Sequence, residues 1–196
     1  MGRIRKSAED RKREIVETAI RLAGELGPDR VTTQRLADEV GLTQPAIFRH
    51  FPTKADIWAA VGREIVSVLD MNRAAATGLR PADQLRMLVT RQLGFVARTP
   101  AITAILMSRE LHAENEALRK HFSKVMADRR AVFASLIAQE QKAGYFRDTV
   151  VPEDAAAVIL ATIQGLAMRW SLEQRRFNLK KDGERLVFGL LDSWKA

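Results

Sequence analysis

Residues 32–54 read TTQRLADEVGLTQPAIFRHFPTK, and this stretch decides the fold. Thr32 is a residue type that caps helix N-termini, and Gly41 supplies a turn conformation that a Cβ would penalise. Pro52 ends the helix that follows this turn, because proline lacks the N–H that a helix interior needs. The stretch therefore predicts two short helices joined by a tight glycine turn.

The positions around the second short helix indicate the same boundaries. Thr43 is a candidate N-cap, and Pro45 falls in the first helical turn, where a missing N–H costs nothing. Thr53 and Asp56 have a spacing that resembles a capping box, which marks the start of the next helix. That helix is expected to run from residue 53 into the 74–78 region.

Apolar side chains in this stretch fall where a compact pair of helices must bury them. They are Leu36, Val40, Leu42 and Ile47, and Ala37 leaves room for the second helix to approach. A pair of this kind is a helix-turn-helix, whose second helix fits the major groove of DNA. The same spacing also occurs in helical hairpins of other proteins, so the pattern alone leaves both interpretations open.

Helical periodicity continues through the rest of the chain, and no stretch is convincing as a strand. Helix starts at the prolines 81, 100 and 152 and a long apolar stripe over residues 118–137 bring the expected total to about nine helices. We therefore predict an all-α protein with a three-helix DNA-binding domain in residues 1–52 and a helical domain in residues 53–196. The fourth helix is expected to join the two without a flexible linker.

Composition is that of an ordinary globular protein, with 46% hydrophobic and 29% charged residues. The absence of cysteine excludes disulfides and thiolate metal sites and permits a cytoplasmic setting, which we expect. The longest stretch without charge, residues 155–168, has 14 residues, so we expect no membrane partner.

The net charge of +8 is concentrated in two places. Residues 1–13 carry six Lys and Arg against two acidic residues, and residues 169–181 carry five against one. The first patch precedes the candidate recognition helix, where it would attract phosphates, although a basic N-terminus is as often a solvated tail. The second patch has no DNA-reading motif near it, and we interpret it as a solvated helix end or connector.

An enzyme is the competing class, and the sequence offers it little support. It contains no Gly-x-Ser-x-Gly motif, no phosphate-binding glycine loop and no cysteine nucleophile. Its three histidines are too few for most histidine-rich metal sites. We therefore predict no catalytic residue, no metal site and no cofactor.

The stretch from about residue 15 to residue 65 resembles the DNA-binding domain of the tetracycline-repressor (TetR) family. A short recognition helix that ends in an aromatic-x-His-aromatic run and is closely followed by lysine is typical of that family. The matching features are Thr32-Thr33 before Leu36-Ala37, the run GLTQPAIFRHF at residues 41–51, and Lys54 two residues after Pro52. Over the remaining two thirds, the resemblance extends only to length, helix content and a loop at 144–152.

The resemblance implies that ten residues contact DNA: Thr33, Gln34, Thr43, Gln44, Pro45, Ala46, Phe48, Arg49, His50 and Lys54. Gln44 would reach into the major groove and pair with adenine. His50 and Lys54 would hold phosphates, and Arg49 would bond a guanine or a phosphate. Phe48 departs from the family pattern, which usually has tyrosine there, so a hydroxyl bond to phosphate is not available.

The resemblance also assigns two roles to the body of the protein. The last two helices would pair with those of a second subunit through Ile159, Ile163, Leu166, Leu186, Leu190 and Trp194. Earlier helices would enclose a small apolar effector, in a pocket lined by Asn72, Gln92, Phe95, Met107, Phe122, Met126 and Phe133. Apolar residues at this spacing are also ordinary core filler, so both assignments compete with a simple helical core.

These inferences combine into one functional hypothesis. The protein would be a dimeric, sequence-specific DNA-binding regulator, by the family default a repressor, that binds a near-palindromic operator and releases it when an effector tilts the fourth helix. The alternative is a helix-turn-helix protein without a small-molecule ligand, acting in DNA organisation or through a protein partner. A cavity in the body, or its absence, would separate the two.

Overall fold

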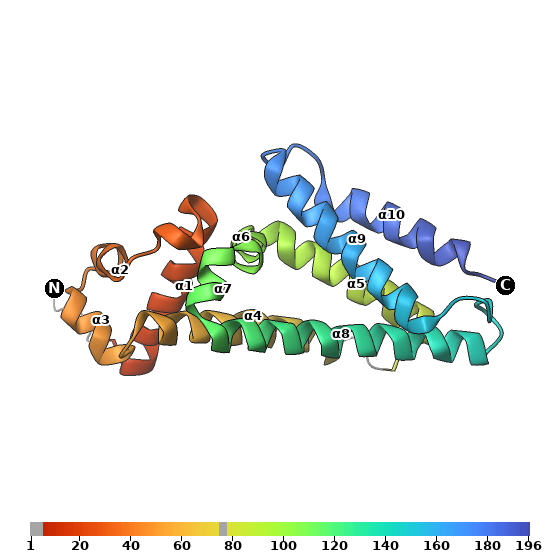
Figure 1. Ribbon diagram of the computed structural model, residues 1–196, viewed down its shortest axis with the longest axis horizontal. Helices are drawn as coiled ribbons and strands as arrows, with labels where there is room; N and C mark the ends of the chain where they lie inside the picture. Colours follow the sequence, from red (N-terminus) through yellow and green to blue (C-terminus); the bar gives the residue numbers. More distant parts are fainter. Residues whose placement is uncertain (1–5, 75–77) are drawn as a thin grey trace.

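The computed structural model describes the backbone of residues 6–74 and 78–196, and the side chains of these ranges except residues 71–74. Within these ranges the chain forms ten α-helices and no strand, so the predicted all-α class is confirmed (Figure 1). The helices are α1 (Ala8–Leu26), α2 (Thr33–Val40), α3 (Gln44–His50), α4 (Lys54–Ala74), α5 (Pro81–Arg98), α6 (Ala101–Met107), α7 (Arg109–Glu114), α8 (Glu116–Lys142), α9 (Pro152–Leu172) and α10 (Leu179–Ser193).

The number of helices is ten rather than about nine because Ser108 interrupts the helix and separates α6 from α7. Ser108 has an extended backbone, with φ −74° and ψ 109°, and its hydroxyl accepts a hydrogen bond of 3.0 Å from the N–H of Leu111. The same hydroxyl donates to Asp29, in the 3₁₀ turn Pro28–Arg30, over 2.7 Å. A serine that satisfies both a helix start and a distant carboxylate ends one helix and begins another.

The two short helices end and begin where the sequence predicts. The Thr32 hydroxyl accepts a bond of 3.1 Å from the N–H of Arg35, and Gly41 is left-handed, with φ 65°. Thr53 and Asp56 form the reciprocal bonds of a capping box at the start of α4, of 2.9 and 3.1 Å. Thr43 occupies the N-cap position of α3 as predicted, although its hydroxyl makes no capping bond.

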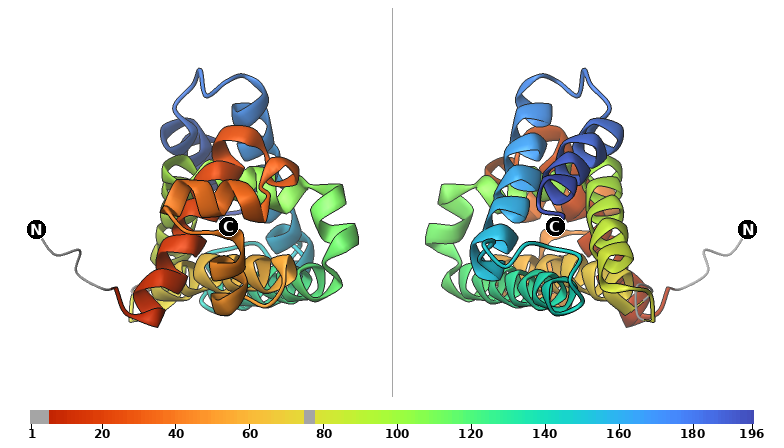
Figure 2. Two further views of the ribbon diagram at one scale, coloured as in Figure 1. Left: turned by 90° about the vertical axis from the view of Figure 1, so that its left-hand side faces the viewer. Right: turned by 90° about the vertical axis from the view of Figure 1, so that its right-hand side faces the viewer.

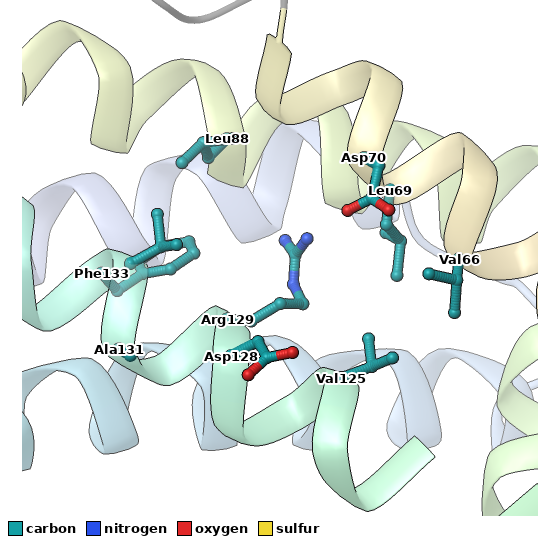
Figure 3. A pocket seen from close by; sticks show the side chains of 10 residues that line it. Val66, Leu69, Asp70, Leu88, Val125, Asp128, Arg129, Ala131 and Phe133 are labelled. Carbon is teal, nitrogen blue, oxygen red and sulfur yellow. The ribbon is translucent and has the colours of Figure 1, made fainter. Parts of the chain in front are cut away.

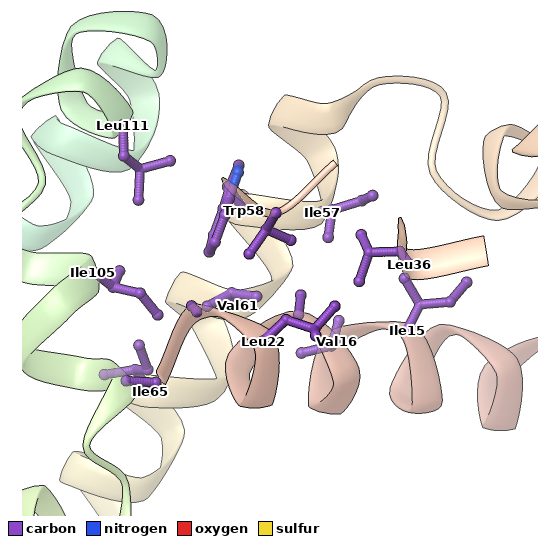
Figure 4. Close-up of a cluster of buried hydrophobic side chains, with 14 of the residues drawn as sticks. Ile15, Val16, Leu22, Leu36, Ile57, Trp58, Val61, Ile65, Ile105 and Leu111 are labelled. Carbon is purple, nitrogen blue, oxygen red and sulfur yellow. The ribbon is translucent and has the colours of Figure 1, made fainter. Parts of the chain in front are cut away.

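Helices α1 to α3 form a compact head at one end of the molecule, and α4 leads from it into the body (Figure 1). The buried core of the head is continuous with that of the nearest body helices. Ile15 and Leu36 in the head and Trp58 and Val61 in α4 belong to one apolar cluster, which extends to Ile105 of α6 (Figure 4). Head and body therefore share a core.

The body is a bundle that includes α5, α8, α9 and α10 (Figure 2). These four helices enclose a second apolar cluster. Its centre includes Leu93 of α5, Ile137 of α8, Ile159 of α9 and Val187 of α10, each at most 1% exposed. Among the described helices, α9 alone is long and apolar enough by length and composition to cross a membrane. In the fold α9 packs against α8 and α10 and contributes to this core.

Candidate nucleic-acid interface and body cavities

Helix α3 lies at the free end of the head and presents one face outward (Figure 1). Ile47 anchors it, because this side chain is fully buried against the head. Around that anchor Thr43, Pro45 and Arg49 are exposed, and Phe48 has 40% of its surface exposed. The remaining residues predicted to contact DNA lie on or beside the same end, exposed or half-buried: Thr33, Gln34, Gln44, Ala46, His50 and Lys54.

Two glutamines on this face are already held by neighbouring side chains. Gln44 donates from Nε2 to the hydroxyl of Thr33 over 2.7 Å, which fixes the amide between α2 and α3. Gln34 donates to Asp38, one turn later on α2, also over 2.7 Å. Because an amide has two N–H donors and one oxygen acceptor, Gln44 keeps one N–H and its oxygen available to a partner.

Cations of the head divide into paired and unpaired groups. Lys6 and Arg11 both bind Glu14 over 2.7 Å, and the Lys6 ammonium lowers the pKa of the Glu14 carboxyl. Within the part of the chain that the structure describes, Arg49 and Lys54 make no ion pair, so their charge is free to meet an anion. Arg3 and Arg5 of the predicted basic arm lie outside the described residues.

The second basic patch covers the end of α9 and the connection to α10. Arg169 pairs with Glu173 over 2.7 Å and lies 5.0 Å from the ring centre of Phe177, while Arg175 lies 5.7 Å from the ring centre of Trp170. These charges pack on neighbouring side chains at a helix end, as the sequence interpretation expects.

Most of the residues predicted at a subunit interface face the chain's own core instead. Ile159 and Ile163 are at most 1% exposed, Leu166 and Trp194 are 9% exposed, and Leu190 is half-buried; only Leu186, 41% exposed, points outward. The outward residues of α9 follow a separate helical stripe: Val158, Ala161, Gly165, Met168 and Leu172. Because α9 is apolar around most of its circumference, periodicity does not distinguish the two faces.

A narrow apolar cavity of about 50 Å³ lies between α4, α5, α6, α8 and α9. Five of the predicted pocket residues line it: Gln92, Phe95, Met107, Phe122 and Met126. The side chain of Asn72 lies outside the described residues. Phe133 does not reach this space, because it lies further along α8 and lines a separate cavity.

That second cavity is larger, about 300 Å³, and is lined by α4, α5 and α8 (Figure 3). Arg129 enters it from α8, opposite Asp70 of α4. Sequence reasoning missed Arg129, although one signal was present. It occupies the helical position between Val125 and Phe133 in the apolar stripe of α8, where a cation is unusual.

Comparison with known proteins gives matches over both parts of the chain. Residues 15–61 match the profile of bacterial regulatory proteins of the tetR family, and residues 81–192 match that of the C-terminal region of BetI-type transcriptional repressors. The nucleoid occlusion factor SlmA of Vibrio cholerae is 30% identical over 165 residues, which cover 82% of this chain and 84% of that protein.

Two solved structures share the fold over nearly their whole length. A TetR transcription regulator from Haloarcula marismortui has a TM-score of 0.83 and 22% identity, and the match covers 96% of this chain and 100% of that one. A transcriptional regulator from Saccharomonospora viridis in complex with choline also has a TM-score of 0.83, with 23% identity and coverage of 96% and 99%. These structures share the fold, and the two profile matches show that the chain belongs to the TetR family of DNA-binding transcription regulators, which are not enzymes.

Proposed function

We propose that the protein is a cytoplasmic repressor that binds a near-palindromic operator as a dimer and releases it when a small effector enters the body. The observation that carries this proposal is the placement of α3. The glycine turn and the buried Ile47 hold the helix at the free end of the head, with Gln44 and the unpaired Arg49 on its outer side. A helix held in this way fits a major groove.

In this proposal the residues of α3 divide into readers and anchors. Gln44 reads adenine through the amide N–H and oxygen that its bond to Thr33 leaves free. Pro45 and Ala46 offer apolar contact to a thymine methyl, and Arg49 bonds a guanine or a phosphate. The remaining six residues approach the sugar-phosphate backbone and set the register: Thr33, Gln34, Thr43, Phe48, His50 and Lys54.

A second subunit completes the recognition, because seven residues of α3 reach only a few base pairs. The surface we assign to it is the outward stripe of α9 together with Leu186 and Gly189 of α10. Gly165 and Gly189 have open space where a Cβ would stand, so a partner helix can approach them closely. Three exposed apolar side chains lie along the same stripe of α9 as Gly165: Val158, Met168 and Leu172.

Effector release follows from the way α4 connects the head to the apolar cavity. Its first turns carry Ile57 and Trp58 into the shared core with the head, and its later turns carry Ile65 and Leu69 to the apolar cavity. At Gly62 the α4 backbone lies so close to α8 that a Cβ would be 2.8 Å from Leu118 Cδ1. A ligand that separates α4 from α8 would therefore change the orientation of the head.

Selection of bound sequences from random DNA duplexes, repeated at several salt concentrations, tests the proposed DNA binding. We expect one enriched near-palindromic site and a steep loss of affinity with added salt, because several cations displace counterions from phosphates. No enrichment at any salt concentration would refute sequence-specific binding.

A second candidate function is DNA organisation without a small-molecule ligand. It is favoured by the resemblance to the nucleoid occlusion factor SlmA and by the small volume, about 50 Å³, of the apolar cavity. Adding ligands to the operator complex separates the two candidates. If a small molecule lowers operator affinity the effector proposal holds, whereas binding that responds only to a protein partner favours DNA organisation.

A further inference from the structure

Arg129 is a half-buried cation whose hydrogen bonds are incomplete. One of its terminal nitrogens donates to Oε1 of Gln92, and the guanidinium lies 6.0 Å from the ring centre of Phe133. Its Nε is buried and has no hydrogen-bond partner among the described residues. Since a guanidinium has five N–H donors in a planar fork, most of its capacity to bind an anion is unused.

The neighbouring carboxylates do not neutralise this charge. Asp70 faces Arg129 from α4 but is solvent-exposed, and no ion pair within 4.0 Å joins the two where the chain is described. Asp128 is exposed and pairs with Lys124 over 3.2 Å. Burial lowers the pKa of Arg129 to about 10, and Asp70 opposes this shift only in part. At neutral pH the cavity therefore contains a charged donor without an ionic partner.

The walls around Arg129 are otherwise mostly apolar. Val66 and Leu69 of α4, Leu88 of α5 and Val125 and Val132 of α8 line the same 300 Å³ space (Figure 3). Leu69 also lines the narrow apolar cavity of about 50 Å³. Gln92, the hydrogen-bond partner of Arg129, lines this narrow cavity too. The cavity thus offers one cationic fork beside a continuous apolar surface.

We propose that the 300 Å³ cavity takes a small organic carboxylate, bound through its carboxylate to the Arg129 fork and through its hydrocarbon part to the valine and leucine walls. Two parallel N–H···O bonds to a carboxylate suit the planar guanidinium and would use its free donors. This proposal rests on the proposed function in one respect only, that the bound carboxylate is the effector. It sharpens the expectation of a small, largely apolar effector by giving that ligand a carboxylate.

Calorimetric titration of the purified full-length protein, without DNA, tests the proposal. Butanoate, hexanoate and octanoate are each compared with the alcohol and the amine of the same chain length. We expect at least one carboxylate to bind about tenfold more tightly than its matched alcohol, the size of one favourable charge-assisted contact. Equal binding of acid and alcohol, preference for the amine, or no binding by any carboxylate would overturn the proposal.

Variants of Arg129 assign the effect to this side chain. Arg129→Met keeps a long side chain without charge and should abolish the preference for the acid, whereas Arg129→Lys keeps the charge without the fork and should retain part of it. Arg130→Met is the matched control, because Arg130 is the next residue of α8 and is exposed. Unchanged acid preference in both Arg129 variants, or an equal loss in Arg130→Met, would contradict the assignment.

Operator release, measured separately, distinguishes this proposal from the proposed function. Carboxylate binding that leaves operator affinity unchanged would refute effector release but leave the Arg129 site intact. If ligands release the operator but the acid, alcohol and amine bind equally well, the Arg129 site is refuted and effector release is not.

Discussion

Head and body carry their functional residues in opposite ways. In the head, the outward face comes from consecutive residues on α3 and its neighbours, and Gln44 and Lys54 are only ten positions apart. In the body, Asp70, Leu88 and Arg129 come from three helices and line one cavity (Figure 3). A DNA-reading surface can therefore be recognised from one short stretch of sequence, whereas a ligand cavity depends on how distant helices pack.

The two regions are nevertheless joined by one core. Trp58 is buried where α4 leaves the head, near Leu111 of α7 and Ile105 of α6 (Figure 4). A helix anchored in this way cannot move at the cavity without also moving the head. The two recognition surfaces therefore belong to one mechanically coupled unit.

The largest expected effect is on this shared core. Trp58→Ala should lower the free energy of unfolding by about 3–5 kcal/mol, because it leaves a large cavity in a buried apolar cluster. Urea unfolding followed by circular dichroism should show one transition shifted as a whole. Tyr145→Ala is the control, since Tyr145 is 57% exposed and should change stability little. Two separate transitions, with only one of them shifted, would show that head and body are independent.

Replacing a cation of the head should have a smaller effect, which falls on DNA affinity. Lys54→Ala should weaken binding of every duplex sequence about equally, by about 1.5–3 kcal/mol, because it removes a charged contact to phosphate. The slope of log affinity against log salt should fall by about one. Lys142→Ala removes the same charge at the far end of α8 and should change neither quantity much (Figure 1). A loss confined to one operator sequence would contradict the assignment of Lys54 as a phosphate anchor.

In the ligand-free body, removing the half-buried, unpaired charge of Arg129 should have a stabilising effect of modest size. Arg129→Met should raise the free energy of unfolding by about 1 kcal/mol near neutral pH, because the unpaired charge disfavours the folded state. Burial lowers the pKa of Arg129 to about 10, so the folded wild-type protein releases this proton before the unfolded chain does. The advantage of the variant should therefore be constant below pH 9 and shrink as pH rises through 10.

Paired urea titrations of both proteins at pH 8 and pH 10.5 check this prediction, because all other titrating groups are common to the two. If the variant is less stable than wild type at pH 8, the charge of Arg129 is already compensated by another group in the free protein.

The smallest expected effect restores the residue type that the family usually has on α3. Phe48 is 40% exposed, so a hydroxyl added by Phe48→Tyr can reach solvent or a phosphate without disturbing the core. One added hydrogen bond should tighten operator binding by about 0.5–1.5 kcal/mol. Filter-binding titrations of the selected duplex check the change, and weaker binding by the tyrosine variant would place Phe48 away from the backbone.

The sequence predicts the structure of the head better than that of the body. Thr32, Gly41 and Thr53 predicted the head correctly because caps and left-handed turns depend on local geometry. Periodicity failed on α9, where apolar residues surround the helix, so Ile159 and Ile163 were assigned to a partner although they fill the chain's own core. The break at Ser108 was missed because Asp29, its partner, is 79 positions away.

Arg129 illustrates the same limit for the site. Its position in the apolar stripe of α8 is visible in the sequence, but its bond to Gln92 depends on the packing of α5 against α8. Five of the predicted pocket residues do line one cavity, because apolar stripes face inward together. The larger cavity with its half-buried cation could be found only from the three-dimensional arrangement of the helices.

The most direct test of the central claim, that α3 reads DNA through Gln44, repeats the selection from random duplexes with Gln44→Ala. Gln139→Ala is run in parallel, because Gln139 is an exposed glutamine on α8, a body helix. We predict that Gln44→Ala loses its preference at one position in each half-site, at a cost of about 1–3 kcal/mol, while Gln139→Ala selects the wild-type site. An unchanged site for Gln44→Ala would contradict the account.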